Sequence, residues 1–315
     1  MGVRSSWVAV VALVALACGS QTPRTGETTG AVGEGESEYR TKIVLLGTGN
    51  PNADPERSGP AVAIVVDSTS YLIDLGPGVV RRAAAAYQSG IEGLQASRLR
   101  TAFITHLHTD HTLGYADFIY TPWVLERDVP AEVYGPSGLQ EMTDHLLAAY
   151  EQDIRIRIDG LEPANTEGYK VNVHEIEPGV IYEDELVRVT AFPVQHGSWR
   201  QAFGFRFDTP DRSIVISGDA RPSPGVAQAC QGCDVLIHEV YSQAGFERRD
   251  PVWQTYHSSF HTSGPELGEI AAEAQPGMLI LYHQLLWGAT PSELVEEIKA
   301  NFNGIIVYGN DLDVF

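Results

Sequence analysis

The sequence predicts an α/β fold in which two β-sheets are packed between layers of helices. β-prone and helix-prone segments alternate from residue 39 to residue 315, and they form two strand-rich blocks that are each followed by helices. Each block supplies one sheet, and each sheet must bury its apolar face against another layer. No composition shift, repeat or polar tract divides this stretch, so we expect a single domain over residues 39–315.

The elements follow from apolar periodicity, helix-cap residues and turn signals. We expect strands at residues 42–46, 61–66, 71–73, 101–104, 132–134, 170–175, 186–192, 202–207, 213–216, 235–237, 278–281 and 305–308. We expect helices at residues 79–87, 139–151, 264–274 and 291–301, and another can begin within residues 112–118. Ser263 and Thr290 are the expected N-caps of the last two helices, because their hydroxyls can accept from free backbone N–H groups.

The first 18 residues have the pattern of an export signal. An apolar run at residues 7–17 follows Arg4 and is too short for a membrane-spanning helix, which needs roughly 20 residues. Cys18 comes next, and the sequence Ala-Leu-Ala-Cys resembles a bacterial lipoprotein signal, in which the Cys thiol is lipidated, although Ala15 stands where Leu is favoured. We therefore expect an exported lipoprotein anchored to a membrane of the cell envelope. The alternative is a plain secretory signal and a periplasmic or secreted protein.

Composition and charge restrict the partners. Residues 19–38 are mostly Gly, Thr, Ser and Glu, so they cannot bury a core and are expected to form a flexible linker. The net charge of −20 repels phosphate backbones, so long nucleic acids are not expected as partners. A bound metal pair can still make one pocket locally positive for a small anion. The oligomeric state is left open, and a homodimer is compatible with the sequence.

Four metal-ligating side chains are gathered between residues 106 and 111. His106 and His108 follow a β-prone run, and extended backbone directs alternate side chains to one side. Asp110 and His111 lie in the turn that follows and can approach a neighbouring point. Imidazole and carboxylate ligands in this mixture suit zinc or a similar divalent metal. The alternative to this prediction is a polar loop that binds no metal.

Three further candidate ligands each follow a predicted strand. They are His196, Asp219 and His283, and Gly218 allows the backbone to turn so that Asp219 can reach inwards. A single histidine at the end of a strand is commonly structural. The order of these three residues after the first motif makes the set informative.

Together these residues resemble the metallo-β-lactamase-fold hydrolases over nearly all of residues 39–315. The resemblance implies a four-layered αββα sandwich with two divalent metal ions, most simply zinc, at the seam of the sheets. It also implies the ligands: His106, His108 and His196 on one metal, Asp110, His111 and His283 on the other, and Asp219 bridging both. True β-lactamases lack the bridging Asp, and flavodiiron relatives have Glu in place of the second His, so both branches are disfavoured.

Two further motifs resemble ribonuclease Z. His238-Glu239 resembles its His-Glu pair, and His261-Thr262-Ser263 resembles its His-Ser-Thr or His-Thr-Ser element, as does the opening Leu46-Gly47-Thr48-Gly49 with Pro51 and Arg57. In this interpretation His261 holds a non-bridging phosphoryl oxygen, and His238, oriented by Glu239, donates a proton to the leaving group. The alternative for both histidines is structural support of the metal ligands.

The predicted function is a dinuclear metal-dependent hydrolase in which a hydroxide between the metals attacks and Asp110 orients it. The protein departs from ribonuclease Z because it is acidic, carries an export signal and lacks a Gly-rich basic arm between residues 123 and 181. We therefore expect a phosphodiesterase that acts on a substrate smaller than tRNA. A lactonase, thioesterase or arylsulfatase is the alternative among enzymes, and a non-catalytic membrane-tethered binding protein is the alternative of another class.

Cys230 and Cys233 form a Cys-Gln-Gly-Cys sequence without a second pair to complete a structural zinc site. In an exported protein, a local disulfide or two unreactive thiols is the expected state.

Overall fold

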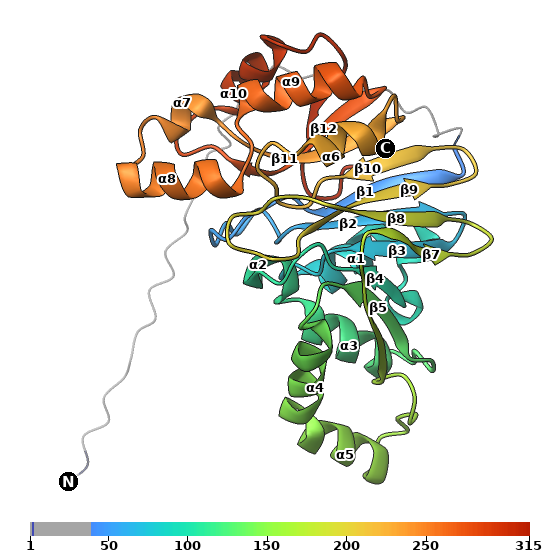
Figure 1. The fold of residues 1–315 in the computed structure, drawn as a ribbon. Coiled ribbons are helices and arrows are strands. Elements are labelled where there is room, and N and C mark those ends of the chain that lie inside the picture. The colour runs from blue at the N-terminus through green and yellow to red at the C-terminus, as the bar shows by residue number, and fades with distance from the viewer. Residues whose placement is uncertain (1, 3–38) are drawn as a thin grey trace. The chain divides into compact units, whose positions relative to one another are not determined.

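Two β-sheets lie against each other in the computed structural model of the protein, and helices cover the outer face of each (Figure 1). The structure describes Gly2 and residues 39–315. The expected signal sequence, Cys18 and the linker at residues 19–38 therefore lie outside the described residues. Among the described residues, no helix is long and apolar enough to cross a membrane.

The first sheet has six strands in sequential order. They are β1 (Thr41–Gly47), β2 (Ala61–Val66), β3 (Thr69–Ile73), β4 (Thr101–Phe103), β5 (Ala131–Gly135) and β6 (Val171–Glu175). The second sheet has seven strands in the order β13-β12-β11-β10-β9-β8-β7. They are β7 (Gly179–Glu183), β8 (Arg188–Pro193), β9 (Phe203–Asp208), β10 (Ser213–Ile216), β11 (Val235–Tyr241), β12 (Met278–Leu285) and β13 (Ile306–Tyr308).

The helices divide between the two outer layers. The segments that connect the strands of the first sheet contain α1 (Val79–Gln88), α2 (Thr109–Thr112), α3 (Tyr115–Val124), α4 (Leu139–Ala149) and α5 (Glu151–Asp159). The segments that connect the strands of the second sheet contain α6 (Pro224–Cys230), α7 (Gln243–Phe246), α8 (Pro251–Phe260), α9 (Gly264–Ala274) and α10 (Pro291–Lys299). Short 3₁₀ turns occupy Glu92–Leu94 and Ala96–Arg98.

Strand alternation explains how the layers are held together. In β2, Val62 and Ile64 pack between the sheets, while Ala63 and Val65 face the core under α1 and α3. Because both faces are buried, the strand is a continuous apolar run rather than an alternating one. A third core lies between the second sheet and α6, α9 and α10. The expected four-layered αββα class is confirmed.

Several element boundaries differ from those expected. β11 continues to Tyr241 and β12 to Leu285, so His238, Glu239 and His283 lie inside strands rather than after them. The long helix expected after residue 139 is divided into α4 and α5, and β7, α6 and α8 were not expected. Polar residues inside a strand interrupt its apolar run, so the predicted strands end too early.

The predicted caps are confirmed. The Ser263 and Thr290 hydroxyls accept from backbone N–H groups, and each forms a capping box with the Glu three positions later. Cys230 and Cys233 form a disulfide at the end of α6, which decides between the two states left open by the sequence.

Candidate metal centre

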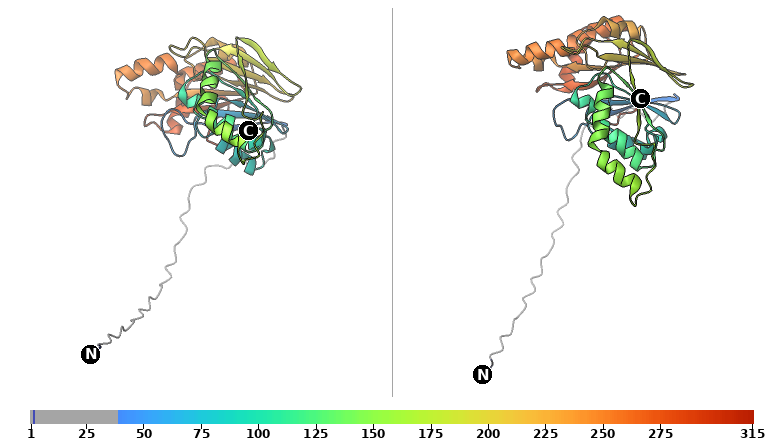
Figure 2. Two further views of the ribbon diagram at one scale, coloured as in Figure 1. Left: turned by 90° about the horizontal axis from the view of Figure 1, so that it is seen from below. Right: turned by 60° about the horizontal axis from the view of Figure 1, so that its bottom comes forward.

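The predicted ligands meet at one end of the two sheets, where α2 and α8 lie in Figures 1 and 2. His106, His108, Asp110 and His111 occupy the loop after β4 and the short helix α2. The loops after β8 and β10 and the end of β12 bring in His196, Asp219 and His283. Gly218 has the positive φ of 61° that the turn before Asp219 requires. Loops at the ends of strands from both sheets thus form one site.

Three histidines make the first group. The Nδ1 atom of His108 lies 3.0 Å from His106 Nε2 and 3.1 Å from His196 Nε2. Asp219 completes this group, with one carboxylate oxygen 4.0 Å from His196 Nε2. Three ring nitrogens directed at one another are an arrangement that a shared cation satisfies.

Asp110, His111 and His283 make the second group. His283 Nε2 lies 3.2 Å from Asp110 Oδ2 and 3.3 Å from Asp219 Oδ2, and His111 Nε2 lies 3.3 Å from Asp219 Oδ1. Asp219 is therefore next to both groups and uses both carboxylate oxygens. His111 Nε2 and Asp219 Oδ1 are buried and make no hydrogen bond. Such atoms are expected where a missing ligand completes the polar contacts.

The outer nitrogens of two ligands have fixed partners. His111 Nδ1 donates to Asp74 Oδ2 at 2.7 Å, and His196 Nδ1 donates to the carbonyl of Phe260 at 2.8 Å. Both partners only accept, so each Nδ1 carries a proton, and in the neutral form of each ring the free nitrogen is the Nε2 that faces the centre. Asp74 was missed in the sequence. It directly follows β3, which is the same signal that identified Asp219.

Burial and neighbouring charge set the protonation of the centre. Burial lowers the pKa of His106 well below its ordinary value and that of His196 to about 3, so both rings stay neutral, as metal ligands must be. Burial raises the pKa of Asp219, but His283 and His111 outweigh this effect and hold it well below its ordinary value. Burial lowers the pKa of His111, but Asp219 and Asp74 hold it well above its ordinary value.

The centre therefore combines the neutral imidazoles of His106 and His196 with the ionised carboxylate of Asp219, while the carboxylates around His111 favour its protonated form. A divalent cation balances the same negative charge and meets the unpaired nitrogen and oxygen atoms at the same time. The donor set fits divalent metal ions.

Glu239 and His261 lie beside this donor set. Glu239 Oε2 is 3.4 Å from His261 Nδ1, and that nitrogen is 3.9 Å from Asp219 Oδ2. The other Glu239 oxygen accepts from the backbone N–H groups of Thr262 at 2.9 Å and Ala220 at 3.3 Å. His261 is therefore the ring that the second Glu239 oxygen approaches, but the two atoms are not hydrogen-bonded to each other.

The expected orientation of His238 by the Glu239 carboxylate is wrong. Neighbouring residues of a strand point to opposite faces, and Leu236 and Val240, two residues on either side of His238, pack in the core under the helices. The His238 ring is fully buried, and its Nδ1 lies 2.6 Å from the Glu239 backbone carbonyl. A proton-donor role for His238 gains no support from this position.

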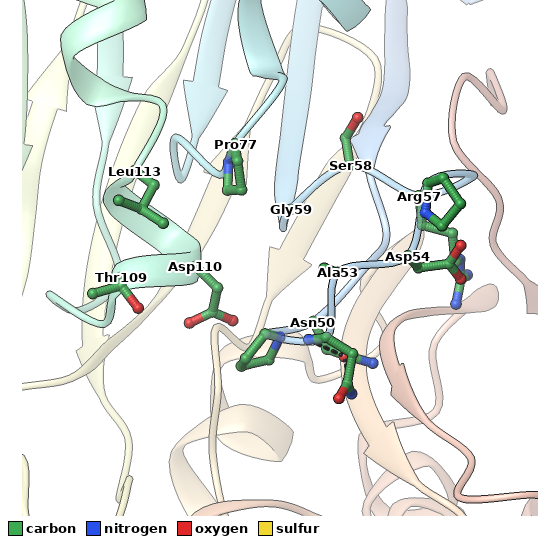
Figure 3. Close-up of a pocket in the computed structure, with 13 residues that line it drawn as sticks. Asn50, Ala53, Asp54, Arg57, Ser58, Gly59, Pro77, Thr109, Asp110 and Leu113 are labelled. Carbon is green, nitrogen blue, oxygen red and sulfur yellow. Dashed lines mark hydrogen bonds between the residues drawn. The ribbon is translucent and has the colours of Figure 1, made fainter.

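A cavity of about 480 Å³ opens next to the centre (Figure 3). Asp110 faces it from α2, and Asn50, Asp54 and Arg57 line it from the loop between β1 and β2. The Trp199 ring packs against His108 with ring centres 5.0 Å apart and lines a second cavity of about 530 Å³.

Known proteins resemble this chain in both sequence and fold. Residues 69–284 match the Beta-lactamase superfamily domain. The chain is 33% identical to Ribonuclease Z of Mycobacterium sp. (strain KMS) over 246 residues, which cover 78% of this chain and 84% of the relative. It is 30% identical to Ribonuclease Z of Mycobacterium marinum over 276 residues, 86% of this chain and 96% of the relative.

Two solved structures share the fold. The short form of human tRNase Z has a TM-score of 0.64 at 23% identity, covering 87% of this chain and 98% of that one. The metallo-β-lactamase-fold protein YhfI from Bacillus subtilis has a TM-score of 0.67 at 17% identity, covering 87% and 99%. The chain therefore belongs to the β-lactamase superfamily, as a ribonuclease Z-like, metal-dependent hydrolase of the metallo-β-lactamase fold.

Proposed function

We propose that this hydrolase is a dinuclear phosphodiesterase that acts on small diesters. The observation that carries the proposal is the position of Asp219, which contacts ligands of both groups while His261 and Glu239 lie alongside. His106, His108 and His196 would hold one metal, and Asp110, His111 and His283 would hold the other, with Asp219 shared between the two groups. Zinc suits this mixture of nitrogen and oxygen donors.

The metals and the protein divide the chemistry. Divalent metals bound there would lower the pKa of water to about 7 and so would supply the nucleophile at neutral pH. Asp110 has a carboxylate that faces the cavity and orients the attacking group. His261 approaches from the Asp219 side, where it can hold a phosphoryl oxygen or supply a proton to the leaving oxygen.

Glu239 and His261 form a proton relay in this proposal. Burial and the neighbouring Asp219 raise the pKa of Glu239 well above its ordinary value, while burial lowers that of His261 to about 4, so the resting proton lies on Glu239. When His261 gives its Nε2 proton to the leaving oxygen, its Nδ1 takes the proton from Glu239, which becomes a carboxylate. The ring stays neutral before and after the transfer, which avoids the cost of a buried imidazolium.

Cavity size and charge favour a small substrate. A volume of about 480 Å³ lies in the usual range for small-molecule sites, roughly 300–1,000 Å³. The helices α4 and α5 extend from the sandwich (Figure 1), but the arginines of α5 are already paired: Arg155 with Glu151, and Arg157 with Asp153 and Glu162. They offer no free basic surface for a polynucleotide.

We also propose that the protein is exported and attached to a membrane of the cell envelope. Residues 1–18 direct export, Cys18 carries lipid, and residues 19–38 tether the hydrolase domain of residues 39–315 to the membrane. The sequence pattern around Cys18 supports this part of the proposal.

A substrate panel tests the proposed activity. Zinc-loaded protein is assayed with bis-p-nitrophenyl phosphate, p-nitrophenyl sulfate, a homoserine lactone and a thioester, at equal concentrations. The phosphodiester is expected to have the highest kcat/KM. A higher value for the sulfate, lactone or thioester would overturn the phosphodiesterase proposal in favour of the corresponding activity, while leaving the metal assignment intact. An Asp219→Ala variant controls for contaminating phosphodiesterases.

A further inference from the structure

His283 is held in a conformation that its own strand does not favour. Its φ is 47°, in the left-handed region, which is uncommon for any residue other than glycine. Between β11 and β12, Glu239 pairs with Tyr282 and the next residue, Val240, pairs with Gln284. His283 is therefore the extra residue of a β-bulge. A non-glycine residue in this conformation is strained and persists only when its surroundings hold it there.

The bulge turns the His283 ring toward the centre. Ile280 and Tyr282 face the core between the sheets, whereas Leu279 and Leu281 face the core under the helices. Regular alternation would place His283 on the helix side with Leu281. The left-handed backbone instead brings Nε2 to 3.2 Å from Asp110 Oδ2. The position of this ligand depends on the bulge.

A set of hydrogen bonds from the loop between β1 and β2 holds the residue after the bulge. Arg57 Nη2 donates to the Gln284 side-chain oxygen at 2.5 Å and to the carbonyl of Gly309 at 3.1 Å. Asn50 Nδ2 donates to the Gln284 backbone carbonyl at 2.8 Å. The Gln284 amide in turn donates to the carbonyls of Leu281 at 2.7 Å and Gly309 at 3.0 Å.

This network, which we call the Arg57 clamp (Arg57, Asn50 and Gln284), is built into the structure. Gln284 is 2% exposed, and the Arg57 guanidinium also lies 5.5 Å from the centre of the Tyr308 ring. Gln284 holds the chain on both sides of His283. Its side-chain amide donates to the carbonyl of Leu281, which lies before the bulge, and its own carbonyl, just after the bulge, accepts from Asn50. The clamp therefore fixes the two ends of the bulge.

The loop that carries the clamp is itself anchored. Asp311 accepts from the backbone N–H groups of Thr48 at 2.8 Å and Ser58 at 2.7 Å. Arg82 lies 3.2 Å from Asp311 and donates to the Ser58 hydroxyl at 2.9 Å, without contacting Gln284. Arg82 thus supports the same loop and takes no part in the clamp, which makes it a matched control.

We infer that Arg57 is a positioning residue that sets the metal affinity of the Asp110–His111–His283 position by holding the His283 bulge. The inference rests on the proposed assignment of His283 as a ligand. It also gives the loop two roles, because Arg57 and Asn50 line the cavity beside Asp110 as well (Figure 3).

The test is a metal titration of full-length protein against a chromogenic chelator, with cobalt absorption spectra as a second readout. The zinc-binding step that His283→Ala weakens is assigned to the Asp110–His111–His283 position and is called the second step. Arg57→Gln is expected to weaken this step by about tenfold or more, since outer partners of metal ligands are typically worth 10–100-fold in affinity. The cobalt spectrum of that step should change as well. Arg57→Lys, which keeps the charge but cannot reach two acceptors in the same way, is expected to give an intermediate loss.

Two variants separate the clamp from general loop stability. Arg82→Gln is expected to leave the second zinc step unchanged, and an equal loss there would overturn the inference. Gln284→Met is expected to weaken the second zinc step at least as much as Arg57→Gln, because it also removes the bonds from Gln284 to Leu281 and Gly309. The losses should be less than additive in the double variant, because both changes remove the Arg57–Gln284 bond. Asn50→Ala, at a half-buried loop position, provides a milder change if the others fold poorly, and it too should weaken the second step.

The outcomes are distinct from those that test the proposed function. A wild-type second zinc step in Arg57→Gln with unchanged cobalt spectra would refute the clamp. A two-step titration that depends on Arg57, in an enzyme that does not cleave phosphodiesters, would support the clamp and count against the proposed substrate. A wild-type protein with a single zinc step would overturn both the dinuclear assignment and the inference drawn from it.

Discussion

Replacing Glu239 by Gln is the sharpest test of the proton relay, because the change keeps the shape of the side chain and removes the proton it can release. The amide oxygen can still accept from the Thr262 and Ala220 backbone N–H groups, so no buried backbone donor is left unpaired. The amide nitrogen can still donate to His261 Nδ1, which lies 3.4 Å from the carboxylate. Only the transfer of the proton is lost.

The expected loss depends on the leaving group. A positioned acid is typically worth 10²–10⁴-fold, so kcat for a diester with an alkoxide leaving group should fall by about 100-fold, or about 2.7 kcal/mol in the barrier. p-Nitrophenolate hardly needs a proton, so kcat for bis-p-nitrophenyl phosphate should change little. His261→Ala should reduce both, because that ring also stabilises phosphoryl oxygens. KM should change less than kcat in each case.

Steady-state kinetics with both substrates, together with zinc content, decide the question. His238→Asn is the control: it alters a fully buried ring on the helix side, so it should lower Tm while kcat per folded molecule stays near wild type. Equal losses with both leaving groups in Glu239→Gln would refute the relay. Loss of zinc together with activity would show that Glu239 and His261 support the ligands instead.

Three further outcomes are expected. Elemental analysis should give about two metal ions per chain, and Asp219→Ala should weaken both sites because it removes the shared carboxylate. Mass spectrometry of the mature N-terminus should find lipid on Cys18, and a different start without lipid mass would indicate a soluble exported protein. Partial burial raises the pKa of Asp184, but hydrogen bonds from the Tyr71 and Tyr182 hydroxyls outweigh it and hold the pKa below its ordinary value. The stability from Asp184 should therefore be present at neutral pH and lost as pH falls through the folded-state pKa; in acid-unfolding curves, Asp184→Asn should remove this loss.

The sequence predicted the donor set because metal ligands on this fold lie close to strand ends. Four candidate ligands lie within six residues of the sequence, so their metal-binding chemistry can be recognised without the fold: His106, His108, Asp110 and His111. His196 and Asp219 follow apolar runs, which are also local signals. The structure brings all of them together, and it adds no type of donor that the sequence had not already suggested.

Distances between segments were not predictable in the same way. Asp74 lies next to His111 only because β3 and β4 are paired in parallel, which brings the ends of the two strands together. The Arg57–Gln284 contact joins residues that are far apart in the chain. No local pattern connects such pairs, because the long-range packing of the sheets creates their contacts.

The sequence by itself determined the fold class, the helix caps at Ser263 and Thr290, and the assignment to the metal-dependent hydrolases, and it predicted the candidate ligands in their order along the chain. The tertiary structure decided which of the neighbours His238 and Glu239 faces the centre. A one-residue difference in strand phase exchanges the two faces, and the boundary of β11 that sets this phase is hidden by the polar residues inside it. It also decided that His283 reaches the centre through a bulge, because only paired strands reveal which residue is extra.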